Sequence, residues 1–347
     1  MGITELPLVG PLLSILDLSP VTTATSASTA LRNTLDLARR ADQLGYTRYW
    51  LAEHHNAPSV ASTAPDIMVG QIAAATSHIR VGSGGVMIHN HRPLVVAERF
   101  KTLSALFPGR IDLGIGRAPG GDSVTSKALG RGEDGGSDDY EERLIELFRF
   151  ETREFPDGHP LHSVYAMPSD AALPAVWLLG STGHSAEIAA SHGTGFAFAH
   201  HFAKYDARDA IATYRCRFRR SRWFDHPYAI LAVHVICAGT DAEAERLAAT
   251  SDYNFARSSR REFLPLVSPD VALDYAYDAI DIERIKASRT HMFVGCPQTV
   301  HGQLARLIEA ANPDELMISS MIYDHDARCR SFELLSKNFG LVDQGGG

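Results

Sequence analysis

Short apolar runs alternate along this chain with segments of helical periodicity, and this alternation constrains the fold more than any other feature. Strand-like runs occur at 12–18, 49–52, 79–88, 111–115, 176–179, 196–199, 230–237 and 316–321. Helical patterns follow nearly all of them, at 31–44, 64–76, 93–107, 184–192, 206–218, 241–256, 300–310 and 328–338. The pattern predicts a parallel sheet, because each crossover between parallel strands needs a connection such as a helix.

Eight strand–helix repeats favour a closed (β/α)₈ TIM barrel with insertions. An open dinucleotide-binding sheet is the alternative, but Leu18-Ser19-Pro20-Val21 does not supply the glycine-rich turn that it needs after the first strand. Residues 1–347 are therefore predicted to form a single barrel domain. Two stretches, 116–138 and 258–291, show no clear period, and we interpret 258–291 as a candidate lid insertion. The end of the chain, 343–347, is expected to be a disordered tail.

Local signals predict where several helices begin and end. Gly45 suits the position just after a helix, and Pro93 suits the first turn of the next. Asp241 is predicted to cap the helix over 241–256.

Composition excludes several classes of protein. Hydrophobic residues make up 45% and charged residues 21%, which is typical of a globular enzyme-sized chain. The formal net charge of −8 argues against a nucleic-acid partner. The four cysteines, Cys216, Cys237, Cys296 and Cys329, form no C-x-x-C pair, which suits a reducing compartment. Without a signal peptide or a long apolar span, we expect a soluble cytoplasmic protein with no membrane partner.

Titratable side chains follow the second strand, where a barrel places its active site. Glu53, His54 and His55 stand in a row there. A neutral imidazole can donate a hydrogen bond or accept a proton, so these three residues are the predicted catalytic group. The alternative is that Glu53 and one histidine only satisfy the loop backbone.

The third strand is rich in glycine, with Ser83, Gly84 and Gly85 in its second half. Glycine inside a strand usually marks a bulge or a close approach of the backbone to a ligand. We predict that a flat cofactor lies against these three residues. The alternative is a demand for small residues in barrel packing.

Two further strand ends predict an anion site. Arg117 follows the fourth strand among glycines, and a guanidinium is a bidentate clamp for phosphate. After the fifth strand the chain runs into a helix through hydroxyl and glycine residues, namely Gly180, Ser181, Thr182 and Ser185. Together these residues predict a phosphate-bearing cofactor at a helix N-terminus. A loop salt bridge and an ordinary Ser/Thr cap are the alternatives.

Histidine pairs also raise the question of a metal. His89 with His91, and His200 with His201, are the candidates. Barrel metallohydrolases typically carry a His-x-His at the end of the first strand, where this chain has 14–17 without histidine. No metal site is predicted, and a His-rich metallohydrolase barrel is kept only as an alternative.

These residues together resemble the bacterial-luciferase-like flavin-dependent monooxygenases. The resemblance is carried by segments at 13–21, 37–87, 108–122, 175–190, 195–202, 294–300 and 314–335, in the order of the family. It implies a barrel that binds reduced FMN at the carboxyl ends of its strands, with His54 as the catalytic histidine beside the flavin. It places Arg117, Ser181, Thr182 and Ser185 in the phosphate-binding segments, and a non-proline cis peptide at Ser83-Gly84.

The implied function is an FMN-dependent monooxygenase, an oxidoreductase that uses reduced flavin and O₂ to oxidise a small organic substrate. A separate flavin reductase would supply the cofactor, and helices 64–76 and 93–107 would form a homodimer. A deazaflavin-dependent dehydrogenase on the same scaffold and a non-catalytic flavin-binding protein are the alternatives. Two stretches at strand ends depart from the expected pattern and could alter the substrate pocket: 88–92, with His89 and above all His91, and 199–202, with an extra histidine in His200-His201.

Overall fold

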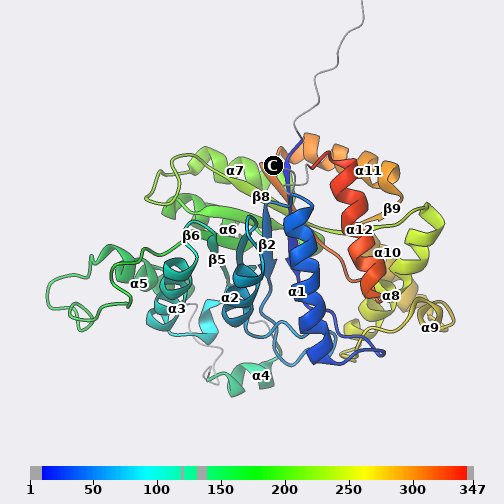
Figure 1. The fold of residues 1–347 in the computed structure, drawn as a ribbon, viewed down its shortest axis with the longest axis horizontal. Coiled ribbons are helices and arrows are strands. Elements are labelled where there is room, and N and C mark those ends of the chain that lie inside the picture. Colours follow the sequence, from blue (N-terminus) through cyan, green and yellow to red (C-terminus); the bar gives the residue numbers. More distant parts are fainter. Residues whose placement is uncertain (1–9, 119–120, 131–138, 342–347) are drawn as a thin grey trace, which may run out of the picture.

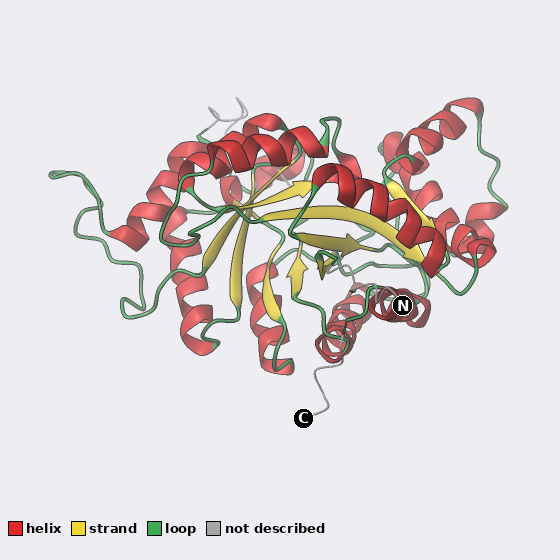
Figure 2. Cartoon of the chain, turned by 90° about the horizontal axis from the view of Figure 1, so that it is seen from above, coloured by secondary structure: helices red, strands yellow, loops and turns green. Residues whose placement is uncertain are grey.

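The computed structural model describes residues 10–118, 121–130 and 139–341. Its parallel strands close into a ring by pairing along their edges. Figure 2 shows these strands with helices packed around them. Around the ring the strands are β1 (Leu12–Asp17), β2 (Arg48–Leu51), β3 (Arg80–Ser83), β5 (Ile111–Gly116), β6 (Ala175–Gly180), β7 (Gly195–Ala199), β8 (Ala229–Cys237) and β10 (Glu315–Ser319), with the short β4 (Val86–Met87) continuing β3 beside β5. The predicted (β/α)₈ barrel is confirmed, and these are the eight predicted strand regions.

Strand β10 closes the ring because it pairs on both edges. Leu316 lies opposite Leu13 of β1 and Leu231 of β8. The second half of β8 runs beyond the ring and pairs with β9 (Met292–Gly295). The sequence analysis missed β9, because four residues between two helices give too short a pattern to recognise.

Helices surround the strands (Figure 1). They are α1 (Ala27–Gln43), α2 (Pro65–Ala75), α3 (Pro93–Leu106), α4 (Ser123–Ala128), α5 (Tyr140–Thr152), α6 (Gly183–His192), α7 (Ala207–Arg217), α8 (Asp241–Ser259), α9 (Pro269–Leu273), α10 (Ala279–Arg289), α11 (Pro297–Ala311) and α12 (His325–Asn338). Their apolar sides pack on the outer faces of the strands and form one large buried core. Within the described ranges, no helix combines the length and the apolar character needed to cross a bilayer.

Two of the three predicted helix signals are confirmed. Gly45 has φ +80° directly after the C-cap of α1, and Pro93 occupies the first turn of α3. The prediction for Asp241 is wrong, because Thr240 is the N-cap of α8 and accepts from the N–H of Glu243. Asp241 instead accepts from the backbone N–H of Cys296 at 2.7 Å, which joins the start of α8 to the start of α11.

The two stretches without a clear period contain helices. Short α4 lies within 116–138, and α9 and α10 lie within 258–291. The segment 258–291 is tied to the loop after β1, because Leu266 accepts from the N–H of Thr23 at 2.8 Å and donates to the carbonyl of Val21 at 2.9 Å. Its role as a lid stays a prediction. The predicted tail 343–347 lies outside the described residues.

Charged side chains close the barrel at the amino ends of the strands. Arg48 lies 2.9 Å from Asp112 and 2.9 Å from Glu315, while Arg80 lies 2.6 Å from Asp112. Both carboxylates are fully buried, and the Arg48 guanidinium stacks 4.6 Å from the Trp177 ring. This ion-pair network joins β2, β3, β5 and β10, and leaves the opposite end of the barrel for a site.

Candidate functional site

A cavity of about 630 Å³ opens at the carboxyl ends of the strands, the size of a typical small-molecule site. Eight of the eleven predicted site residues line it: His54, Gly84, Gly85, Arg117, Gly180, Ser181, Thr182 and Ser185. They come from the ends of β2, β3, β5 and β6, which are far apart in the sequence and adjacent in the ring. The rule that parallel strands place their carboxyl ends together is what gathers them.

Most of the remaining wall is apolar. The larger side chains are those of Leu16, Met87, Leu178, Leu179 and Met317. Sequence reasoning did not single them out, since an apolar side chain that lines a cavity has the same pattern as one that fills a core. An apolar wall with polar groups at its ends excludes water from whatever reaction takes place there.

His54 lines this cavity and has one ring nitrogen without a hydrogen-bond partner among the described residues. Its backbone N–H donates to the carbonyl of Ser62 at 2.9 Å, which fixes the loop after β2. Its Nδ1 atom is buried and has no hydrogen-bond partner among the described residues. Burial lowers the pKa of His54, and the nearby Glu53 carboxylate offsets this only in part. The imidazole is therefore neutral at pH 7, with one nitrogen left for a ligand.

Glu53 and His55 stand behind the cavity rather than in its wall. Glu53 is fully buried and lies 2.9 Å from the Nε2 atoms of both His55 and His91. It also accepts from the backbone N–H of Met87 at 2.9 Å. Burial would raise the pKa of Glu53, but these hydrogen bonds outweigh it and hold that pKa below its usual value. The carboxylate thus links the loop that carries His54 to the segment after β3.

The glycine strand meets the cavity at Gly84 and Gly85. The non-proline cis peptide lies between these two residues, one position later than the predicted Ser83-Gly84 bond. A Cβ atom on Gly84 would stand 2.6 Å from Leu16 Cδ1, so this position admits only glycine without displacement of the wall. Ser83 is fully buried, and its hydroxyl donates to the carbonyl of Gly114 at 2.8 Å. The structure therefore gives Ser83 a role in joining β3 to β5.

The hydroxyl-rich turn is the start of α6. Thr182 and Ser185 form a capping box, in which each side chain accepts from the backbone N–H of the other at 3.3 Å. A Cβ atom on Gly180 would stand 2.0 Å from the Ser185 hydroxyl, so glycine makes room for the cap. The ordinary cap is present, and it leaves Ser181, Arg117 and the N–H groups of the first helical turn around the same end of the cavity.

His201 is a further polar group in the wall. Its Nδ1 lies 3.2 Å from the carbonyl oxygen of Ala232, and burial lowers its pKa to about 4. The other three histidines considered above as metal ligands, His89, His91 and His200, each contact a different group. His91 contacts Glu53, His89 lies 3.0 Å from Asp139, and the ring of His200 packs against that of His291.

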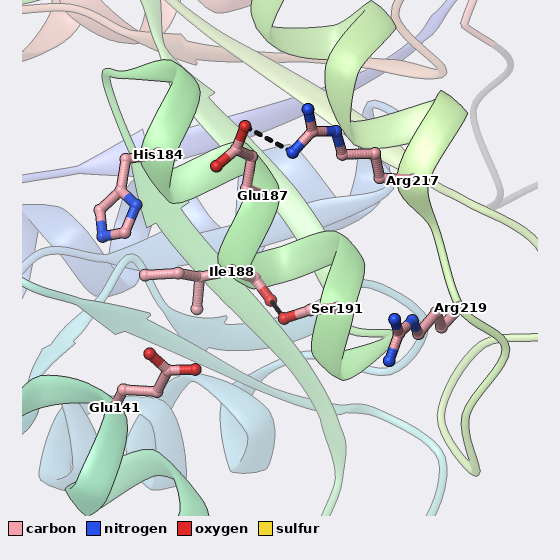
Figure 3. A pocket seen from close by; sticks show the side chains of 7 residues that line it. All are labelled: Glu141, His184, Glu187, Ile188, Ser191, Arg217 and Arg219. Atoms are coloured by element: carbon pink, nitrogen blue, oxygen red, sulfur yellow. Dashed lines mark hydrogen bonds and ion pairs between the residues drawn. The ribbon is translucent and has the colours of Figure 1, made fainter.

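A second hollow of about 480 Å³ lies on the outer face of α6 (Figure 3). Two of its charged groups pair with each other, since Arg217 donates to Glu187 at 2.7 Å. Ser191 donates to the carbonyl of Ile188 within α6 at 2.9 Å. None of the eleven predicted site residues lines this hollow, so the cavity at the barrel mouth is the candidate site.

Comparison with known proteins gives a consistent result. Residues 13–311 match the family model described as luciferase-like monooxygenase. A luciferase-like monooxygenase of Escherichia coli (strain K12) is 40% identical over 321 residues, which is 92% of this chain and 95% of that protein. The YvbT protein of Bacillus subtilis (strain 168) is 41% identical over 325 residues, covering 94% of this chain and 96% of its own length.

Solved structures agree in fold. The crystal structure of apo-MsnO8 superposes with a TM-score of 0.87 at 38% identity, covering 97% of this chain and 99% of that one. Two more distant structures share the fold alone: the oxygenating constituent of 3,6-diketocamphane monooxygenase from Pseudomonas putida (TM-score 0.70, 19% identity, covering 96% and 98%) and an F420-dependent secondary alcohol dehydrogenase (TM-score 0.66, 13% identity, covering 95% and 99%). With the family model matched over most of its length, the chain belongs to the luciferase-like monooxygenase family.

Proposed function

We propose that this chain is an FMN-dependent monooxygenase that takes reduced flavin and O₂ and oxidises a small organic substrate. The observation that carries the proposal is a single cavity lined by neutral His54, whose Nδ1 has no partner among the described residues, by apolar side chains, and by a polar end with Arg117 and Ser181. The Pseudomonas putida structure of the same fold was solved in complex with FMN, which supports a flavin here. The F420-dependent neighbour makes a deazaflavin the rival cofactor.

The residues present fit a flavin phosphate at one end of the cavity. Arg117, Ser181 and the first turn of α6 would hold the phosphate, because a guanidinium, a hydroxyl and helical N–H groups all favour an anion. The flat surface at Gly84 and Gly85, opposite Leu16, would take the ring system. Arg117 lies on the exposed side of this end and reaches it from β5.

Reduced FMN, when bound, supplies the electrons with which O₂ is activated. The chain's own contribution is to orient the reactants, exclude water and manage a proton. Neutral His54 can accept a proton at its buried Nδ1 or hold one there for a neighbouring oxygen atom. Glu53 holds the loop of His54 in place from behind, and the apolar side chains around Met317 keep bulk water out.

The substrate that this cavity favours is small and largely apolar. Its walls offer His201 as one hydrogen-bonding group and no carboxylate among the described lining residues. A B. subtilis relative named N-acetyl-S-alkylcysteine monooxygenase is 32% identical over 93% of this chain and 97% of its own, which places thioethers first among the compounds to test. A separate flavin reductase and a homodimer complete the proposal.

The test is an anaerobic titration with reduced FMN, followed by turnover with ¹⁸O₂ in the presence of thioethers, aldehydes and ketones. We expect binding in the micromolar range and a product that has gained one labelled oxygen atom. His54→Ala should retain flavin binding and lose about 100-fold or more in turnover, the usual worth of a positioned acid or base. Sedimentation of the apoprotein should give twice the mass of one chain.

Control experiments distinguish the monooxygenase from the two alternative functions. His301→Gln, an exposed change on α11, should leave binding and turnover intact. Oxidation of an alcohol with reduction of oxidised deazaflavin, without O₂ and with no binding of reduced FMN, would contradict the monooxygenase and establish the dehydrogenase. Tight FMN binding with no labelled product, and no difference between His54→Ala and the unaltered protein, would leave a flavin carrier instead.

A further inference from the structure

Three side chains with metal-binding atoms meet on the outside of the barrel, between its first and last helices. Asp36 lies on α1, and His325 and Cys329 lie on α12, which packs beside α1 (Figure 1). His325 Nε2 is 2.9 Å from Asp36 Oδ2 and 3.5 Å from Cys329 Sγ. The Sγ and Oδ2 atoms are 3.9 Å apart. Across the described residues, this is the one group of three that could hold a metal ion.

The geometry of the group suits a metal better than a proton relay. His325 and Cys329 are four positions apart, which puts both on one helical face. In a relay the thiol and the carboxylate contact opposite nitrogens of the imidazole. Here both are closest to the same Nε2 atom, so three ligand atoms converge on one point. Bonds of about 2.0–2.3 Å to tetrahedral zinc place such atoms roughly 3.3–3.6 Å apart, which lies within the observed range of separations.

A buried ion pair holds the two helices that carry these ligands. Asp17 accepts from the Thr34 hydroxyl at 2.7 Å and from Arg328 at 2.5 Å. Thr34 is two residues before Asp36, and Arg328 directly precedes Cys329. The backbone of both ligand segments is therefore fixed before any ion binds, which lowers the entropy cost of assembling the site.

Charge and access also fit a divalent cation. One thiolate and one carboxylate neutralise a 2+ ion, and Arg40, which donates to Asp36 at 2.9 Å, has Glu333 as a second partner at 3.8 Å. Cys329 is buried, whereas the Asp36 side chain is 43% exposed. An ion can thus enter from the Asp36 side and keep a water molecule as its fourth ligand.

We propose that Asp36, His325 and Cys329 bind one divalent cation of the zinc class, with water in the fourth position. The mixed sulfur, nitrogen and oxygen donors select zinc or cobalt over magnesium or calcium, which prefer oxygen alone. The ion would join α1 to α12 and so link the first helix of the barrel to the last. This site is independent of the proposed flavin chemistry, because none of its three ligands lines the cavity.

The test uses the full-length protein after treatment with a chelator, titrated with Co²⁺ and, separately, with Zn²⁺. We expect one equivalent of Co²⁺ with an intense near-ultraviolet band from thiolate-to-cobalt charge transfer. One zinc ion per chain should appear in native mass spectrometry, with a higher melting temperature because the ion binds only the folded state. Flavin binding should not change the cobalt spectrum.

Matched variants decide the assignment. Cys329→Ser should abolish the charge-transfer band, whereas Cys216→Ser, at an exposed cysteine on α7, should keep it. Asp36→Asn and His325→Gln should each weaken binding by about tenfold or more, and they remain decisive if Cys329→Ser does not fold. Absence of a stoichiometric band, or a band kept in Cys329→Ser and lost in Cys216→Ser, would overturn the proposal.

Discussion

Burial keeps the imidazoles near the carboxyl ends of the barrel strands neutral. It lowers the pKa of His54, brings that of His201 to about 4, and brings that of His234 to about 3. Of these, His54 and His201 face the cavity, and His234 Nδ1 lies 3.2 Å from the Ser319 hydroxyl. A neutral imidazole carries one ring nitrogen that donates a hydrogen bond and one that accepts, so it can contact either kind of group on a bound molecule.

Protonation of these histidines predicts a loss of stability on acidification. A group whose pKa is lower in the folded state binds fewer protons there than when unfolded, so the free energy of unfolding falls as the pH drops through the interval between the two values. For His201 that interval runs from about 6.5 down to about 4. His201→Gln should therefore lose less stability between pH 7 and pH 5 than the unaltered protein, by on the order of 1 kcal/mol. Urea denaturation at both pH values measures this, and equal losses in the two proteins would contradict it.

Sequence alone could locate His54 but not its surroundings. The position after a strand identifies a site residue in a barrel. The role of Glu53 depends on Met87 and His91, which the ring brings in from the next strand. The partners of a buried carboxylate cannot be derived from its own neighbours in the sequence.

At the scale of elements, apolar runs and helix-ending residues located the eight ring strands and most helices. They failed for β9, which is short, for α4, α9 and α10, which lie in the two stretches without a clear period, and for α5, which follows a glycine-rich stretch that hid its start. Asp241 shows a further limit, because both it and Thr240 are good N-cap residues. Only the backbone N–H of Cys296, from a distant segment, decides what the Asp241 carboxylate does.

Gly84, which follows β3, gives a prediction about the stability of this element and its binding of flavin. Gly84→Ala would place a methyl group 2.6 Å from Leu16 Cδ1 in the cavity wall, so we expect a loss of about 1–3 kcal/mol in stability and weaker flavin binding. Gly302→Ala is the matched control, since Gly302 lies within α11 with open space around it. It should gain about 0.5–1 kcal/mol and leave flavin binding unchanged. Thermal unfolding and flavin titration of both variants test this, and similar effects of the two changes would argue against it.

At the scale of the whole molecule, the number of strand–helix repeats predicted the closed barrel. The strand pairs and side chains that close it could not be predicted from the sequence. The ring is completed by β10 between β1 and β8, and its amino end is sealed by Arg48 with Asp112 and Glu315. Sequence reasoning did not single out these three residues. Each stands at or near the start of a strand, and only the closed ring brings them together.

This network predicts a large cost for the loss of its central cation. Arg48→Met would leave the buried carboxylates of Asp112 and Glu315 without that partner, which should reduce stability by about 3–5 kcal/mol. Arg217→Met, which breaks the exposed pair with Glu187, should change stability by less than about 1 kcal/mol. Chemical denaturation at pH 7 compares the two variants. Equal effects would mean that Arg48 contributes no more than a surface ion pair.

The separation of the two ends of the barrel has a consequence for how such a protein can change over generations. The amino end holds the fold through Arg48, Arg80, Asp112 and Glu315, and none of them lines the cavity. Substitutions of cavity-lining residues, such as Met317 or His201, can thus change the shape of the cavity while the ion-pair network stays intact. A duplicated copy of this chain can therefore accumulate cavity substitutions that suit a new substrate and still fold. We expect selection to tolerate the fewest substitutions at the end of the barrel that carries the ion-pair network.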